Sequence, residues 1–286
     1  MGGIRVSGLV FCDGCVQNAG VRKRTRFLFV VLLVAVVGGI GWVVWRPREP
    51  VYQGKTLSEW LERYDRIMTN GQNSLGEQKA IDDAVRHFGT NALPTLLRGL
   101  RAKESPLAKK FFALVKRQHV LKIEHVPAWV RQVEAAAGFE ALGAKGKDAV
   151  PELLAMCEDA KFFKSRISIV SALGSIGPEA RPAVPLLVRW LGDTNGGCDT
   201  FAVLALGRIH AEPEVGVPGL ITCLSNQNGM IRWYAANALG QYGADAKAAV
   251  PDLHKLLNDS DAGVKEAAEN ALWEIDTGAA AKAGVK

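Results

Sequence analysis

Residues 237–259 read NALGQYGADAKAAVPDLHKLLND, and this stretch decides the fold because the chain repeats it. Residues 204–226 read LALGRIHAEPEVGVPGLITCLSN, and residues 171–193 read SALGSIGPEARPAVPLLVRWLGD. Each copy begins 33 residues after the one before it. Self-similarity at a fixed period of this size is the signature of a repeat architecture, in which every copy is one structural unit. The sequence therefore predicts a stack of similar units.

Each copy has the helix-start and turn residues of a helical hairpin. In the last copy, Pro251 stands in the first turn of a helix, where its missing N–H is not needed, and apolar residues follow at helical spacing. A polar turn over residues 258–263 precedes a second apolar stripe between Val264 and Ile275. One hairpin cannot bury its apolar face alone, so neighbouring hairpins must stack. This pattern predicts an all-α fold, an α-solenoid.

Weaker copies extend the pattern toward the N-terminus. Residues 138–156 read GFEALGAKGKDAVPELLAM, and residues 86–100 form a more distant copy, RHFGTNALPTLLRGL. The chain between these two copies is longer than one unit needs, which predicts an additional basic helix near residues 106–121. We expect the repeats to cover residues 81–276 and residues 277–286 to form a flexible tail.

A helix that caps the stack is predicted over residues 56–80. Thr56 and Glu59 resemble a capping box, in which each side chain accepts a hydrogen bond from the backbone N–H of the other residue. Leu57 and Trp60 would then share the apolar face of this helix. Terminal units need such a cap because their outer face has no neighbour.

The Ala-Leu-Gly motif, the Val-Pro helix start and the turn with Asp or Asn together resemble HEAT repeats, particularly the short variety of the phycobilisome lyases. The resemblance covers roughly residues 81–276. It implies a binding scaffold, whose concave surface is formed by the second helices and holds a protein or peptide segment. A lyase-type or lyase-accessory protein acting on a bilin is the alternative, because the same repeats occur there. Under the scaffold hypothesis, purified residues 52–286 carry neither metal nor chromophore.

The resemblance also implies a structural ladder at the junctions between units. The family pairs an acidic or amide residue in the turn with a basic residue six positions later. The residues that fit this pattern are Asn226 with Arg232, Asp259 with Lys265, and Arg166 at the basic position alone. Ala160 occupies the position where the partner of Arg166 should be. Since stacking explains a residue that recurs at a junction, we interpret these residues as structural.

An apolar run near the N-terminus predicts a membrane anchor. Residues 27–45 read FLFVVLLVAVVGGIGWVVW, which is long enough to cross a hydrocarbon core of about 30 Å. The basic tail of residues 1–26 should stay in the cytoplasm. The linker of residues 46–55 would then lead to a repeat domain on the extracytoplasmic side, so the sequence predicts a single-pass, membrane-tethered scaffold.

Two further hypotheses concern this N-terminal region. A cleaved signal peptide is the alternative to the anchor, although the apolar run ends in bulky residues and no small-residue cleavage site follows it. Translation is expected to start near Val21, immediately before the basic cluster, because residues 1–20 suit no fold.

The net charge of +6 does not predict nucleic-acid binding. Residues 1–51 hold seven Lys and Arg against two acidic residues, which leaves the remainder of the chain almost neutral. Residues 98–122 are the exception, with eight basic residues against Glu104. The central basic residues are Lys109, Lys110, Lys116 and Arg117. They form either a solvated helix face or a site for an anionic partner or lipid headgroups.

No group of residues in the sequence predicts catalysis. The five histidines are scattered, no His-Glu dipeptide occurs, and HExxH, P-loop and GxSxG motifs are missing. Cys12 and Cys15 have CxxC spacing, but no second pair completes four metal ligands. We therefore expect no catalytic residue, no metal and no cofactor. The expected partner is a protein or a peptide.

Overall fold

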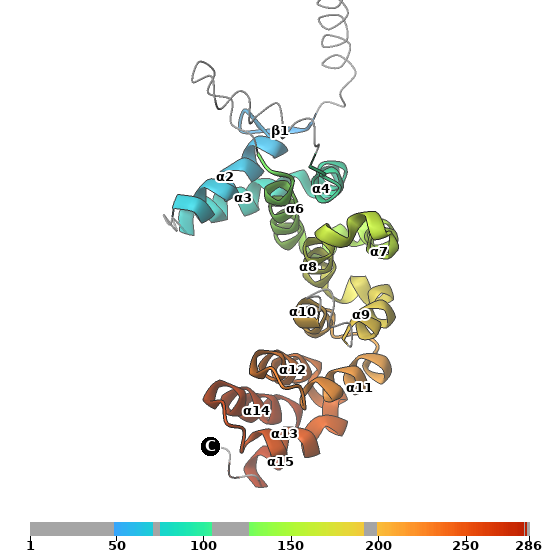
Figure 1. Cartoon of the computed structure of the whole chain (residues 1–286). Coiled ribbons are helices and arrows are strands. Elements are labelled where there is room, and N and C mark those ends of the chain that lie inside the picture. Colours follow the sequence, from blue (N-terminus) through green and yellow to red (C-terminus); the bar gives the residue numbers. More distant parts are fainter. Residues whose placement is uncertain (1–48, 71–74, 105–125, 192–198, 283, 285–286) are drawn as a thin grey trace, which may run out of the picture. The chain divides into compact units, whose positions relative to one another are not determined.

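The computed structural model describes residues 49–286 except 71–74, 105–125, 192–198, 283 and 285–286. The chain divides into two compact units, Met1–Arg48 and Glu49–Lys286. The description below concerns the second unit, in which helices follow one another as stacked hairpins (Figure 1).

A short β-hairpin opens the second unit, where a linker was expected. Its strands, β1 (Val51–Tyr52) and β2 (Lys55–Thr56), pair antiparallel. Gln53 and Gly54 form the turn between them, both with positive φ, as a tight hairpin turn requires. The strand residue Tyr52 stacks on His87 at 4.1 Å between ring centroids. The β-hairpin is thereby packed against the helical part of the chain that follows it.

Two helices stand where one capping helix was predicted. They are α2 (Leu57–Asn70) and α3 (Leu75–Phe88), which pack against each other. The predicted capping box opens α2: the Thr56 N–H donates to Glu59 Oε2 at 2.6 Å, and the Glu59 N–H donates to Thr56 Oγ1 at 3.3 Å. Leu57 and Trp60 are buried as expected.

The repeated units each contribute a first helix and a second helix. The first helices are α4 (Leu93–Leu100), α7 (Val150–Glu158), α9 (Val184–Trp190), α11 (Pro213–Cys223) and α13 (Val250–Leu256). The second helices are α6 (Ala128–Leu142), α8 (Arg166–Ile176), α10 (Asp199–Ile209), α12 (Gly229–Tyr242) and α14 (Ala262–Ile275). Short 3₁₀ segments lead into α4, α7, α8, α9 and α13: η1 (Gly89–Ala92), η2 (Gly143–Ala149), η3 (Ala160–Ser165), η4 (Gly177–Ala183) and η5 (Gly243–Ala249).

The second helices form one layer, in which each packs on the next from α6 to α14 (Figure 1). Each first helix packs on the second helix that follows it in the chain. A continuous apolar core lies between the two layers and runs from Leu57 to Ala280. The predicted all-helical class with repeated hairpins is therefore confirmed, apart from the small β-hairpin.

The recurring Ala-Leu-Gly motif is explained by the packing of neighbouring second helices. A Cβ atom added to Gly207 would lie 2.9 Å from Ala238 Cα in the next helix, which is too close for carbon atoms. Gly174 stands in the same relation to Ala205, at 3.0 Å. Glycine at this position therefore lets adjacent helices approach each other closely.

The predicted membrane localisation needs correction. Across the part of the chain that the structure describes, no helix combines the length and apolar character needed to cross a membrane. Even α6, with 15 residues, spans only about 22 Å against a core of about 30 Å. This finding contradicts the localisation expected for a single-pass protein. The predicted anchor at residues 27–45 and its basic tail lie outside the described residues.

Two further expectations concern the rest of the chain. Residues 277–286 were expected to be a flexible tail, but α15 (Thr277–Lys282) is helical and packs on α14. The predicted basic helix near residues 106–121 lies outside the described residues.

Candidate functional site

Exposed apolar side chains lie at equivalent positions on three of the second helices. Val133 in α6, Ile167 in α8 and Trp233 in α12 occupy equivalent positions, because each stands ten residues before the glycine that follows its helix. They are 46%, 41% and 39% exposed. Together with Trp129, Phe163 and Met230, which are also exposed, they form what we call the apolar band. Large apolar side chains exposed at repeated positions indicate a contact surface.

Polar side chains lie at the other end of the same helices. An open pocket of about 480 Å³ is formed at the C-terminal ends of neighbouring second helices. Its lining residues are Glu140, Gly174, Ser175, Gly177, Arg208, His210 and Gln241. We call this the polar pocket, and the apolar band with the polar pocket is called the second-helix face.

Arg208 supplies the positive charge of the polar pocket. Its Nη1 donates to Ser175 Oγ at 3.3 Å, and its Nη2 lies 3.8 Å from Glu140 Oε1. The second distance exceeds that of a hydrogen bond. The side chains of Arg208 and Glu140 are 46% and 61% exposed, so this ion pair is weak.

His210 departs from the repeat at the edge of the polar pocket. The equivalent positions in other units are Gly143, Gly177 and Gly243, all with positive φ. His210 also has a positive φ, of 33°, although it carries a side chain. Its Nδ1 lies 3.0 Å from the Arg208 carbonyl oxygen. A non-glycine residue in this conformation costs about 1 kcal/mol or more, and such strain clusters at functional sites.

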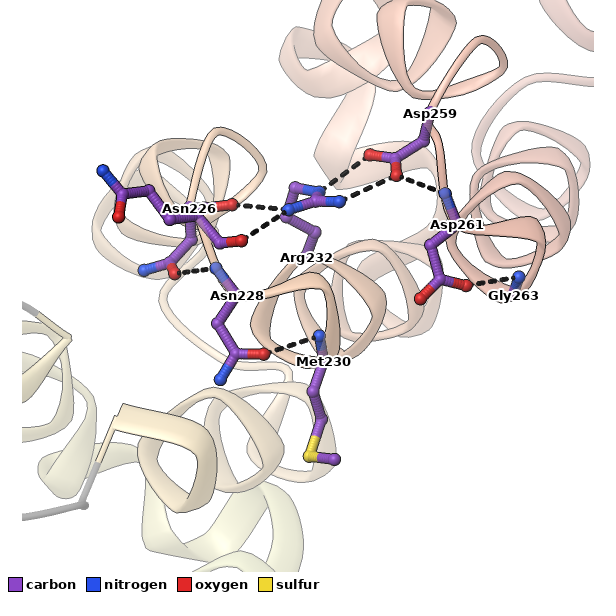
Figure 2. A network of polar contacts seen from close by, with 8 residues as sticks. Asn226, Asn228, Met230, Arg232, Asp259, Asp261 and Gly263 are labelled. Atoms are coloured by element: carbon purple, nitrogen blue, oxygen red, sulfur yellow. Dashed lines mark hydrogen bonds and ion pairs between the residues drawn. The ribbon is translucent and has the colours of Figure 1, made fainter.

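A second polar network joins two units on the opposite, N-terminal side of the second helices (Figure 2). Arg232 Nε and Nη2 donate to the two carboxylate oxygens of Asp259, each at 2.7 Å. Its Nη1 donates to the backbone oxygens of Asn226 at 2.8 Å and Gln227 at 3.2 Å. The two charged side chains are only 15% and 7% exposed. This network connects the turn of one unit to the turn of the next.

The same turns start the second helices. Asn228 Oδ1 accepts from the Met230 N–H at 3.0 Å, and Asp261 Oδ1 accepts from the Gly263 N–H at 2.8 Å (Figure 2). The Asp261 N–H in turn donates to Asp259 Oδ1 at 2.9 Å. Hydrogen bonds from Arg232 lower the pKa of the Asp259 carboxyl, against the opposing effect of burial. The network therefore links the starts of two successive second helices through hydrogen bonds and one ion pair.

The structure brings three of the predicted ladder residues together: Arg232 contacts Asn226, as the pattern paired them, whereas Asp259 has a different partner. Asp259 binds Arg232 of the preceding unit, whereas the sequence pattern paired it with Lys265. Asn226 contributes its backbone oxygen to Arg232. Arg166 instead lies over the rings of Phe163 and Trp190, at 5.0 and 5.1 Å from their centroids. Its Nε is buried without a hydrogen-bond partner among the described residues.

The other predicted binding residues, Lys109, Lys110, Lys116 and Arg117, lie outside the described residues. Within the described part of the chain, no group of three or more His, Cys, Asp or Glu is placed to hold a metal ion.

Sequence reasoning missed both parts of the second-helix face. A signal for the polar pocket was available, because the copy LALGRIH places His210 where SALGSIG and NALGQYG have glycine. The apolar band was harder to find, because exposed Trp233 and buried Ile231 are both apolar residues in one helix.

Comparison with known proteins supports the repeat. Residues 193–273 match the family model of HEAT repeats. That match covers α10 to α14, and the preceding hairpins repeat the same pattern in the structure. HEAT repeats generally serve as protein-interaction scaffolds and are typically non-catalytic. No curated protein matches the chain.

Among solved structures, the chain shows some likeness to the crystal structure of an engineered protein. The two chains share 20% sequence identity, and the likeness covers 78% of this chain and 97% of that chain, with a TM-score of 0.41. A similarity of this size carries no information about function.

Proposed function

We propose that this protein is an interaction scaffold that binds a segment of a partner polypeptide along the second-helix face. The apolar band is the observation that carries the proposal. Trp129 is 61% exposed and Met230 is 60% exposed, although large apolar side chains lose free energy of burial when they stay in water. A partner that covers them would recover this free energy.

The layout of the second-helix face suits a polypeptide better than a small molecule. Its apolar positions are distributed over several units instead of converging on one enclosed cavity, and its polar pocket is open. A chain that crosses α6, α8 and α12 would meet exposed apolar side chains on these helices and polar groups near their C-terminal ends. Extended binding surfaces of this kind are typical of stacked repeats.

The proposal is tested by substitution of the apolar band in the full-length chain. A partner polypeptide is first captured by affinity purification with the full-length chain. Trp129→Ala and Trp233→Ala should each weaken its binding about tenfold, since buried tryptophans dominate interface energies. Leu75→Ala is the matched control, because Leu75 is 85% exposed but lies in α3, which is not one of the second helices. Circular dichroism of every variant checks that the helices remain folded. A partner lost equally with Leu75→Ala would refute the second-helix face as its site.

The basic stretch around Lys109 and Arg117 extends this proposal to an acidic partner. Residues 98–122 hold eight basic residues and one acidic residue. Their net positive charge would attract an anionic polypeptide and accelerate its association. Charge reversal at Lys109, Lys110, Lys116 and Arg117 should weaken partner binding most strongly at low salt. Binding that stays unchanged at low salt would support the solvated-face interpretation instead.

No observation in the described residues favours the alternative of a bilin lyase. The family match concerns the repeats alone, and repeats of this type do not specify a reaction. We therefore propose the binding function only.

A further inference from the structure

The polar pocket holds a cation whose hydrogen-bonding capacity is largely unused. A guanidinium has five N–H donors. Among the described residues, the donors of Arg208 reach Ser175 Oγ at 3.3 Å and come no closer than 3.8 Å to Glu140. Arg208 is nearly half exposed and opens into a pocket of about 480 Å³. It can therefore accept a ligand without losing a strong partner.

Other arginines in the described part of the chain are differently placed. The Arg232 guanidinium makes four hydrogen bonds, two to Asp259 and two to backbone oxygens. Arg189 is paired with Glu158 at 3.7 Å, much as Arg208 is paired with Glu140. Its groove, however, is lined by Leu154, Pro182, Pro185 and Leu186, which offer no side-chain hydrogen-bond donor. Arg189 thus provides a matched control.

The groups around Arg208 suit a singly charged planar anion. The Ser175 hydroxyl and the Gln241 amide line the same pocket and are both hydrogen-bond donors. A carboxylate can take two parallel hydrogen bonds from a guanidinium, which gives strength and a fixed orientation. The second negative charge of a phosphate would instead lie close to the Glu140 carboxylate.

We infer that the polar pocket binds one carboxylate of the partner polypeptide, an acidic side chain or its C-terminal carboxylate, with Arg208 as its bidentate ligand. The inference rests on the proposed function. In the unbound protein, Glu140 forms only a weak ion pair with the Arg208 guanidinium, and the incoming carboxylate displaces Glu140. His210 borders the pocket through its Nδ1 contact with the Arg208 carbonyl oxygen. The pocket would therefore select acidic positions within the sequences that the apolar band accepts.

Three small probes separate the two sources of the carboxylate. N-acetylglutamate α-amide has a side-chain carboxylate, N-acetylglutamine has a terminal carboxylate, and N-acetylglutamine amide has neither. The full-length chain, with nitrogen-labelled arginine, is titrated with each probe while the arginine side-chain NMR signals are followed. The signal that disappears in Arg208→Gln belongs to Arg208, and circular dichroism confirms that this variant is folded.

We expect one or both carboxylate probes to shift the Arg208 signal saturably, with little effect of the amide probe. The stronger probe identifies the source of the carboxylate. Glu140→Gln should tighten binding about two- to fivefold, since a weak exposed competitor is removed. Arg189→Gln should leave the titration unchanged. Equal shifts from the amide probe, saturable binding that survives Arg208→Gln, or weaker binding in Glu140→Gln would overturn the inference.

The outcome can be separated from that of the proposed function. If Trp129→Ala and Trp233→Ala abolish partner binding but the carboxylate probes do not select Arg208, the scaffold stands and the pocket inference fails. If the probes bind Arg208 while the tryptophan variants keep the partner, the pocket is real and the proposed role of the apolar band is wrong.

Discussion

Arg232 binds both carboxylate oxygens of Asp259, which stands 27 residues later in the next unit, through two hydrogen bonds of 2.7 Å. Both side chains are mostly buried. Asp259→Asn removes the charge that balances the guanidinium, so we expect it to lower the free energy of unfolding by about 2–4 kcal/mol. The thermal melting temperature of the full-length chain reports the loss. Asp252→Asn is the control, because Asp252 pairs with the 77% exposed Lys255 and should change stability by less than about 0.5 kcal/mol.

The same contact predicts a pH dependence. Hydrogen bonds from Arg232 lower the pKa of Asp259 in the folded protein. Its contribution to stability is therefore present above the unfolded pKa, about 3.9, and is lost as the pH falls through the lower folded value. The melting temperature of the wild type should fall toward that of Asp259→Asn in this acidic range. A difference between the two proteins that persists to the lowest pH would contradict the assignment.

Gly207 should not tolerate a side chain. The added Cβ of Gly207→Ala would lie 2.9 Å from both Ala238 Cα and Ala238 Cβ, so helices α10 and α12 must move apart. We expect a loss of about 1–3 kcal/mol, measured by urea denaturation. Gly76→Ala is the matched control in a helix, because a Cβ there meets nothing within 4 Å. It should stabilise the protein by about 0.5–1 kcal/mol.

Replacing His210 should relieve backbone strain. Its φ of 33° is one that glycine adopts without penalty, and glycine occupies the equivalent positions after α6, α8 and α12. His210→Gly should therefore raise stability by about 1 kcal/mol or leave it unchanged, while weakening the polar pocket. Chemical denaturation measures the first effect. A clear loss of stability would show that the imidazole contact with the Arg208 carbonyl outweighs the strain.

Tyr242 predicts a loss of stability at alkaline pH. Its hydroxyl donates to the Ala211 carbonyl oxygen at 3.0 Å, and burial raises its pKa to about 12. Because the folded pKa lies above the unfolded value of about 10, the contribution is present below pH 10 and is lost as the pH rises toward 12. Absorbance titration of tyrosine should show a late-titrating group that Tyr242→Phe removes. A titration curve that this substitution leaves unaltered would contradict the burial argument.

The 33-residue period was sufficient to predict the stacked hairpins, because it records the same burial requirement in each unit. The capping box at Thr56 and Glu59 was also predictable, since it depends on residues close in the sequence. Asn70 and Gly71 could have indicated the break between α2 and α3, as both favour turns. Local patterns were thus sufficient wherever the contacts are local.

Contacts across junctions were not predictable in the same way. The six-residue pattern suggested Asp259 with Lys265, but stacking places Asp259 beside Arg232 instead. That pairing depends on how one hairpin is set against the next, which no single copy specifies. The exposure of Trp129 and Trp233 likewise follows from which side of each second helix its neighbours leave open.

Site-specific photocrosslinking tests most directly whether the second-helix face binds a polypeptide. A photoreactive residue is placed at Val133 or Trp233 in the full-length chain, with Arg189 and Lys255 on first helices as controls. After illumination in the cells that produce the protein, we expect the same partner polypeptide to be crosslinked from both second-helix positions and from neither control. Crosslinking of that partner from Arg189 and Lys255, with none from Val133 or Trp233, would contradict the account.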